Sequence, residues 1–262
     1  ELVRVGAGVP DLPVRIDGVA RWRASSDVAR RYSEGRIFLA GDAAHVMPPN
    51  GGFGGNTGIQ DAHDIAWKLA YVLNDVADPA LLDTYEAERR PVGVLTVEQA
   101  YSRYVTRTAT YLGATDFQPI AADLEVELGY VYRSGAIAPI PEDDGLAHAD
   151  PRHTAARPGT RAPHVWIERD GISRSMLDLY GRDFVVVTGA GGDEWAAAAA
   201  RFTGLPLLVH EADTGVADAY ALDGRGAVLV RPDGFVAWRA TSPGADPVAA
   251  LTDALATALG KA

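Results

Sequence analysis

The spacing of apolar residues changes along the chain, and these changes predict its secondary structure. A short apolar run at 37–40 is typical of a buried strand, and residues 65–73 repeat apolar side chains at helical spacing. Between these two segments lie an acidic turn and a glycine-rich loop. The sequence therefore predicts a strand, a turn, a loop and a helix, an order in which α/β proteins bind polar or anionic ligands.

A second α/β unit is predicted near the end of the chain. Its apolar runs have the lengths of buried strands, and an alanine-rich stretch and a final amphipathic segment read as helices. The turn Pro232-Asp233-Gly234 between two apolar runs is typical of a β-hairpin. In order, the unit reads as strand, helix, strand, hairpin and helix, at residues 184–188, 194–202, 205–210, 226–239 and 247–259.

The remaining segments give weaker patterns. Residues 79–111 predict one long helical region that Pro91 should end or kink. Alternation or apolar runs predict strands at 14–19 and 128–137, and residues 26–32 suggest a short helix. The stretch 139–157 is rich in Pro, Asp, His and Ala, a composition that is typical of a linker. We expect His148 and His153, which lie in it, to be exposed.

Composition narrows the class of protein. The chain has 262 residues, 47% hydrophobic and 23% charged, which suits one large or two ordinary globular domains. A net charge of −11 argues against nucleic acid or an anionic membrane as the main partner. The absence of cysteine excludes disulfides and thiol chemistry. No apolar run has the length of a membrane span and no signal peptide is visible, so a cytoplasmic protein is the simplest interpretation.

The stretch 41–62 carries the candidate chemistry. Asp42 follows the predicted strand, where its carboxylate can accept hydrogen bonds from ligand hydroxyls, and Pro48-Pro49 stiffens the approach to the loop. Glycines let the backbone come close to a flat ligand, and Asn56-Thr57 is a candidate helix start. The loop glycines are Gly51, Gly52, Gly54, Gly55 and Gly58.

Histidines and carboxylates in the same stretch raise the question of a metal. The spacing of His45 and His63 relative to Asp42, Asp61 and Asp64 matches no metal-site template, so we expect no metal site. His45 is expected to hold the loop after Asp42. Asp61 is expected near the helix start, where the helix dipole favours a carboxylate.

Residues 41–62 closely resemble the second flavin-binding motif of the FAD-dependent aromatic hydroxylases, the group A flavoprotein monooxygenases, and in particular their polyketide-tailoring branch. The resemblance implies that Asp42 holds the ribityl hydroxyls of FAD, that Pro49 lies along the flavin ring, and that the N–H groups of Gly55 and Asn56 face the pyrimidine edge of the ring. The cofactor-binding residues implied in this way are Asp42, Pro49, Gly51, Gly52, Gly54, Gly55 and Asn56.

The resemblance also implies the fold, an α/β protein. The C-terminal part of a Rossmann-like FAD-binding domain would be followed by a thioredoxin-like α/β domain that lacks Cys-x-x-Cys, so its role is structural or in subunit contacts. No Gly-x-Gly-x-x-Gly fingerprint follows a strand, so we expect a C-terminal fragment whose partner is the N-terminal half of the same protein. The expected divisions are the end of a substrate-binding region, the FAD-binding part, a connecting segment and the thioredoxin-like domain, at 1–34, 35–112, 113–157 and 158–262.

The activity implied for the intact protein is hydroxylation of an aromatic polyketide or phenolic substrate with FAD, NADPH and O2. No residue stands out as a catalytic acid or base, and homo-oligomer formation stays open. Two alternatives are a flavin-dependent reductase or epoxidase of the same superfamily and a non-catalytic binding or assembly module. A phosphate-binding NTPase loop is excluded because Gly55-Asn56-Thr57 lacks the required lysine.

Overall fold

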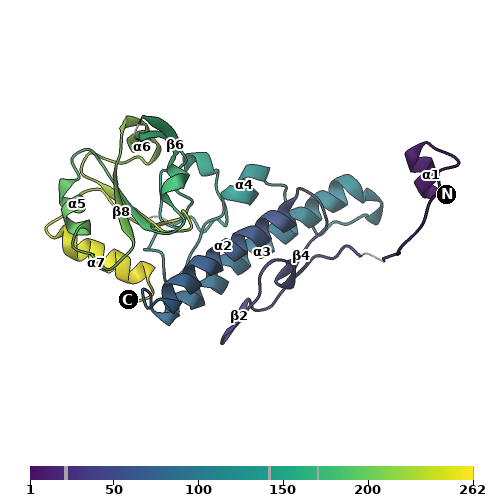
Figure 1. Cartoon of the computed structure of the whole chain (residues 1–262), viewed down its shortest axis with the longest axis horizontal. Helices are drawn as coiled ribbons and strands as arrows, with labels where there is room; N and C mark the ends of the chain where they lie inside the picture. The colour runs from purple at the N-terminus through teal and green to yellow at the C-terminus, as the bar shows by residue number, and fades with distance from the viewer. Residues whose placement is uncertain (21–22, 141–142, 170, 262) are drawn as a thin grey trace.

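The computed structural model describes residues 1–20, 23–140, 143–169 and 171–261. Along the chain it comprises an N-terminal arm with short strands, a long helical hairpin and a C-terminal α/β unit (Figure 1). Helix α1 lies at the far end of the extended arm. The elements of this first part are α1 (Leu2–Ala7), β1 (Asp27–Val28), β2 (Ser33–Glu34), β3 (Ile37–Phe38) and β4 (His45–Val46). β1 pairs with β4 and β2 with β3, both antiparallel.

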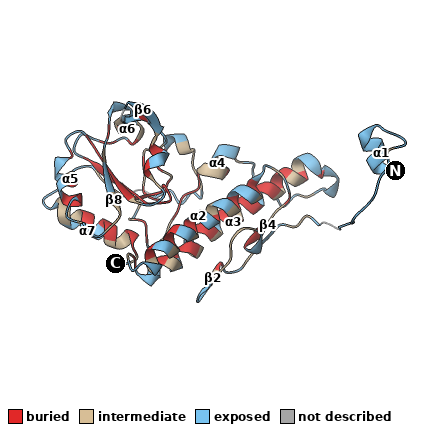
Figure 2. Ribbon diagram, in the orientation of Figure 1, coloured by how far each residue is buried: buried red, intermediate tan, exposed pale blue. Residues whose placement is uncertain are grey.

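Two long helices form the centre of the molecule. Helix α2 (Phe53–Leu73) and helix α3 (Thr84–Arg103) lie side by side, joined by a 3₁₀ turn at Pro79–Asp83 (Figure 1). Figure 2 shows a buried stripe along both helices, interrupted by exposed positions. On α2 the stripe recurs at intervals of three and four residues, as a helix packed on one side requires: Phe53, Thr57, Asp61, Asp64, Trp67, Lys68 and Tyr71.

The C-terminal unit is built on a four-stranded sheet of order β10-β9-β7-β8, in which β7 and β8 are parallel and the other neighbours antiparallel. This order and the elements between the strands are those of a thioredoxin-like fold, as predicted. A separate antiparallel pair, β5 (Trp166–Arg169) and β6 (Ile172–Ser175), precedes it. The sheet unit contains β7 (Phe184–Thr188), α5 (Asp193–Ala199), β8 (Leu207–Glu211), α6 (Thr214–Ala219), β9 (Ala227–Val230), β10 (Val236–Ala240) and α7 (Pro247–Ala258).

Strand β7 is buried on both faces, which explains its uninterrupted apolar sequence. Val185 and Val187 face one core with Val216 and Tyr220 of the α6 side. Phe184 and Val186 face a second core that also contains residues of α5, α7 and the end of α2. In this second core Trp67 and Tyr71 meet the Phe184 ring edge-on, with ring centroids 6.1 and 5.7 Å from it. The helical hairpin and the C-terminal unit therefore share one hydrophobic core.

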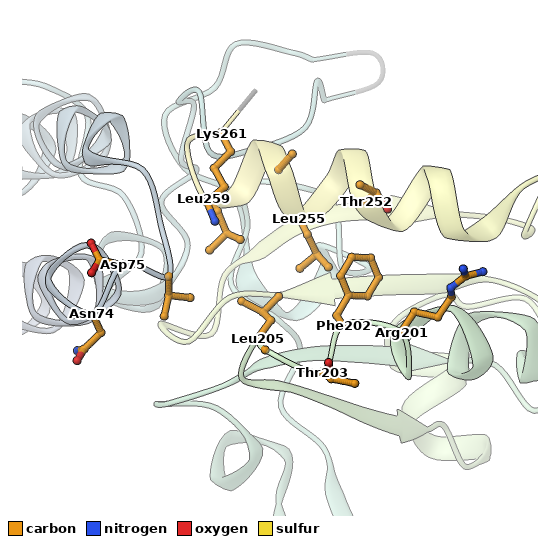
Figure 3. A pocket seen from close by; sticks show the side chains of 13 residues that line it. Asn74, Asp75, Arg201, Phe202, Thr203, Leu205, Thr252, Leu255, Leu259 and Lys261 are labelled. Atoms are coloured by element: carbon orange, nitrogen blue, oxygen red, sulfur yellow. The ribbon is translucent and has the colours of Figure 1, made fainter.

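A surface hollow of about 520 Å³ marks the same junction at the C-terminal end of α2. Figure 3 shows Leu255 of α7 and Leu259, which follows that helix, beside Phe202 and Leu205, with Asp75 on the opposite wall. Since α2 has 21 residues, its two ends lie about 30 Å apart. This hollow is therefore remote from the glycine-rich loop at the other end of the helix.

Several local predictions were wrong. The predicted strand at 14–19 has no regular structure, because no described segment pairs with it. The predicted helix at 26–32 contains β1, which is held by its pairing with β4. The predicted strand at 128–137 is also absent, because the segment comprises the end of a helix at Leu128, an isolated bridge between Tyr130 and His148 and a turn at 134–137. His148 is half-buried and lies 2.9 Å from Glu125, whereas His153 is exposed as predicted.

Pro91 neither ends nor begins a helix, because α3 runs through it to Arg103. A proline inside a helix removes one backbone hydrogen bond and is normally unfavourable. Here the nearby side chains of Arg89 and Val92 are buried in contacts with other segments, and this tertiary packing offsets the cost of the proline.

Within the described residues, no helix has both the length and the apolar character that crossing a membrane requires.

Candidate functional site

Helix α2 begins with an unusual cap. Gly51 and Gly52 both have positive φ angles, 84° and 73°, and Gly52 is the N-cap. Among the described residues no side chain caps the helix, and no acidic residue lies in its first turn. The first N–H groups of a helix have no acceptor inside it, and together with the helix dipole they favour a negative ligand atom. The start of α2 is thus free to bind a polarised oxygen.

The predicted helix start at Asn56 was too late, because α2 begins at Phe53. Phe53 is buried, with its ring 4.8 Å from the Arg103 guanidinium carbon, and this contact fixes the first turn. Gly54 is half-buried, while Gly55 and Asn56 are exposed in that turn. The Asn56 side chain donates to Glu127 Oε1 at 3.1 Å.

Asp42 lies in a 3₁₀ turn, Gly41–Ala43, which two residues separate from the end of β3. Its side chain is exposed, and within the described residues it makes no hydrogen bond or ion pair. The turn packs against the second turn of α2 so closely that a Cβ on Gly58 would lie 3.1 Å from the Gly41 Cα. Backbone contact between these glycines therefore places the Asp42 carboxylate beside the first turns of α2.

Asp61 fixes this turn. It is fully buried, and its carboxylate accepts hydrogen bonds from Gly41 N at 3.0 Å, His45 Nε2 at 2.8 Å and Arg89 Nε at 2.7 Å. Burial alone would raise the pKa of Asp61, but the His45 and Arg89 interactions and the Gly41 N–H hold it below its ordinary value. Asp61 is therefore an anion that ties β4, α3 and the Asp42 turn to α2.

These contacts test two predictions. His45 does hold the segment after Asp42, as predicted, through its bond to Asp61. The prediction that Asp61 lies near the helix start was wrong, because Asp61 is in the third turn of α2 and is neutralised by Arg89. The structure thus brings Asp42, Gly51, Gly52, Gly54, Gly55 and Asn56 to one end of α2, with Pro49 exposed in the segment that leads into it.

Arg89 and the residues around it were missed by the sequence analysis. Arg89 is fully buried and also donates to the Tyr132 hydroxyl at 3.0 Å. The Tyr132 ring in turn stacks on Phe235 of the C-terminal unit at 4.1 Å between centroids. A chain of contacts therefore links the Asp42 turn, through Asp61, Arg89 and Tyr132, to the hairpin of the second unit.

A second group of buried charges lies further along α2. Lys68 Nζ contacts Asp64 at 2.8 Å and Glu88 at 2.7 Å, and Arg231 makes a double contact with Glu88 at 2.6 and 2.8 Å. Arg231 also pairs with Asp233, which accepts a hydrogen bond from the Trp67 indole. We call these five residues, Asp64, Lys68, Glu88, Arg231 and Asp233, the junction cluster, because they join α2 and α3 to the β9–β10 hairpin.

The charges of the junction cluster argue against a metal site there. The three carboxylates have ligand atoms within 4.8 Å of one another, a spacing that a metal ion could bridge. However, Lys68 and Arg231 already contact these carboxylates and neutralise two of the three negative charges. A divalent ion would have to displace both cations, so we interpret the group as an ion-pair network.

The junction cluster has three carboxylates and two cations, and Asp64 is the carboxylate whose charge is least well balanced. Within the described residues its buried Oδ1 accepts no hydrogen bond, although Arg231 Nη2 lies 3.6 Å from it. Burial raises the pKa of Asp64 to about 7, against the opposing effect of Lys68. The pKa of Glu88 is lowered instead: burial would raise it, but Arg231 and Lys68 outweigh burial. The cluster therefore binds a proton on Asp64 near neutral pH.

This proton has a measurable consequence for stability. Because the folded-state pKa of Asp64 lies above its unfolded value, folding takes up a proton between the two pKa values. The stability that Asp64 contributes is therefore complete in acid and is lost as the pH rises toward 7. The difference in unfolding free energy between wild type and Asp64→Asn should fall with rising pH by up to about 1.4 kcal/mol per unit. Urea titrations from pH 5 to pH 8 measure it, and parallel curves for the two proteins would contradict it.

Known proteins share both parts of this architecture. Residues 1–100 match the family described as "FAD binding domain", and residues 155–262 match "Aromatic-ring hydroxylase, C-terminal". A 4-methyl-5-nitrocatechol 5-monooxygenase of Burkholderia sp is 53% identical over 99% of this chain and 50% of its own length. The tetracenomycin B2 monooxygenase-dioxygenase of Streptomyces olivaceus is 44% identical over 100% of this chain and 50% of its own.

Among solved structures, a ternary complex of aklavinone-11 hydroxylase with FAD and aklavinone superimposes with a TM-score of 0.90 at 36% identity. The match covers 99% of this chain and 50% of that one. The chain thus spans about half the length of the curated relatives it matches. Sequence and structure agree that the chain belongs to the family of FAD-dependent aromatic-ring hydroxylases.

Proposed function

We propose that the protein is a monooxygenase that binds FAD at the start of α2 and hydroxylates an aromatic polyketide or phenolic substrate with NADPH and O2. The observation that carries the proposal is the unpaired Asp42 carboxylate beside the uncapped start of α2. The Asp42 carboxylate would accept hydrogen bonds from the ribityl hydroxyls. The N–H groups at the start of α2 would donate hydrogen bonds to a carbonyl oxygen of the flavin ring. The two groups suit the two chemically different parts of FAD.

The fit of the site to FAD rests on what surrounds these groups. Gly51, Gly52, Gly54 and Gly55 present no side chain, so a planar ring can approach the backbone, and Pro49 would flank the ring. A Cβ on Gly52 or Gly55 would meet no atom within 4 Å, so the space beside them is open. We propose Asp42, Pro49, Gly51, Gly52, Gly54, Gly55 and Asn56 as the cofactor-binding residues.

In the proposed reaction FAD, once bound, would take electrons from NADPH and deliver one oxygen atom of O2 to the electron-rich ring. The residues of this chain hold and orient it. Asp42 would anchor the ribityl chain. Asp61, held by Arg89 and His45, keeps the Asp42 turn against α2. The positive end of the α2 dipole would favour negative charge on a bound flavin ring.

We further propose that residues 35–112 complete a FAD-binding domain, with 1–34 as the end of a substrate-binding region, 113–157 as a connection and 158–262 as a thioredoxin-like domain. Residues 21–22, 141–142, 170 and 262 lie outside the described part of these divisions. The relatives are twice as long, so an N-terminal half is proposed as the source of the remaining cofactor and substrate contacts. We also propose that the protein is cytoplasmic. The names of the relatives support neither a reductase nor an assembly module as its function.

The test uses the protein as its gene encodes it. We expect the purified protein to be yellow and to consume NADPH and O2 together when an electron-rich phenol or polyketide is present. Mass spectrometry with isotopically labelled dioxygen should find one labelled oxygen atom in the product. A protein that retains flavin but oxidises NADPH without consuming O2 would favour the reductase, and a colourless protein that binds no added FAD would overturn the proposal.

A further inference from the structure

A second pocket lies away from the proposed flavin site, between α4 (Asp123–Leu128) and the C-terminal unit. Its volume is about 570 Å³, within the range of small-molecule sites. Its apolar wall includes Leu124 and Leu128 of α4 and Leu177, which follows β6. The size and the apolar wall suit a compact organic body.

The charged groups that line this pocket are two arginines. They are Arg152 and Arg161, and the described residues of the lining include no Asp or Glu. This is unusual in a chain with 35 acidic and 24 basic residues. Arg152 is already paired, since it contacts Asp150 at 2.6 Å, so Arg161 supplies the available charge.

Arg161 is positioned to bind but lacks a partner. Its Nε is buried without a hydrogen bond, and within the described residues no carboxylate forms an ion pair with it. The guanidinium lies against the Phe235 ring, 5.6 Å from its centroid, and the backbone is held by the bridge from Arg161 to Phe235. Its two terminal nitrogens are not buried and donate no hydrogen bond within the described residues, so an anionic oxygen in the pocket can accept charge-assisted hydrogen bonds from them.

We propose that this pocket binds a small organic anion, an aromatic carboxylate or sulfonate, with its anionic group on Arg161 and its ring against the leucines of α4 and Leu177. This site lies outside the flavin motif and takes no part in the proposed hydroxylation. Binding of the anion to this site does not require FAD. The experiment below is therefore independent of the test of the proposed hydroxylation.

The experiment is a calorimetric titration of the chain, without flavin, with naphthoate and with the neutral naphthalenemethanol. We expect naphthoate to bind at least about tenfold more tightly than the alcohol, because a charge-assisted hydrogen bond contributes that much or more. Arg161→Gln should weaken naphthoate by a similar factor. Arg174→Gln, which removes an exposed arginine from β6 in the same unit, should leave the affinity unchanged.

A second pair of variants separates charge from shape. Leu124 is partly exposed on α4, so both Leu124→Asp and Leu124→Asn should fold. The aspartate should repel the ligand and weaken naphthoate about tenfold more than the nearly isosteric asparagine does. The proposal is overturned if wild type binds no naphthoate, if the alcohol binds equally well, or if Arg161→Gln and Leu124→Asp both leave the affinity unchanged.

Discussion

An Asp42→Ala variant is expected to bind FAD roughly tenfold to a hundredfold more weakly than wild type, which corresponds to the loss of charge-assisted hydrogen bonds. The carboxylate is exposed and unpaired within the described residues, so its removal breaks no internal contact. The turn that carries it stays fixed by the Gly41 N–H bond to Asp61. The effect should therefore appear in FAD affinity and not in stability.

Fluorescence titration of the flavin-free protein with FAD measures this loss, and thermal unfolding provides the stability control. Asp253→Ala is the matched variant, because Asp253 is also exposed but lies on α7, in the C-terminal unit. It should bind FAD like wild type. If Asp42→Ala kept wild-type affinity, Asp42 would have to be removed from the proposed site.

The order of elements around the proposed site could be predicted because it depends on local sequence. A short apolar run, an acidic residue and several glycines within a few positions permit few backbone paths. The hairpin at Pro232-Asp233-Gly234 was predictable for the same reason, and β9 and β10 do flank it. In these segments the residues that determine the structure are neighbours in the chain.

The residues that hold the site in place could not be predicted in this way. Asp61 is bonded to Arg89, 28 positions away, and Glu88 to Arg231, 143 positions away. No local pattern specifies such partners, and in the sequence Asp64 and Lys68 resemble an exposed pair one helical turn apart. Tertiary packing likewise decides that α3 continues through Pro91.

One signal was nevertheless present. Asp61, Asp64 and Lys68 continue the same three-to-four spacing as Phe53, Thr57 and Tyr71, and so they lie on the face of α2 that is buried. Charged residues on the apolar face of an amphipathic helix require partners. Their positions indicated a buried polar network, although not which residues would complete it.

The junction cluster gives the largest expected loss of stability. Arg231→Met should lower the free energy of unfolding by about 3–5 kcal/mol, the usual cost of removing one partner from a buried ion pair. Arg231 is fully buried and contacts Glu88 through two nitrogens, and its loss would leave Lys68 alone to balance Asp64, Glu88 and Asp233. It would also remove a cation–π contact with the Trp67 ring at 5.2 Å.

Arg225→Met is the matched control, because it makes the same chemical change in the same unit. Arg225 pairs with Glu194 at 3.0 Å, but both side chains are more than half exposed, at 62% and 52%. Such exposed pairs contribute about 0–1 kcal/mol. Urea unfolding of the two variants compares them directly, and equal losses would contradict a stabilising role for the cluster. The junction cluster and a shared hydrophobic core join the helical hairpin to the C-terminal unit. Because Arg231→Met removes part of this connection, it should also separate the unfolding of the two units, so that a single transition becomes two.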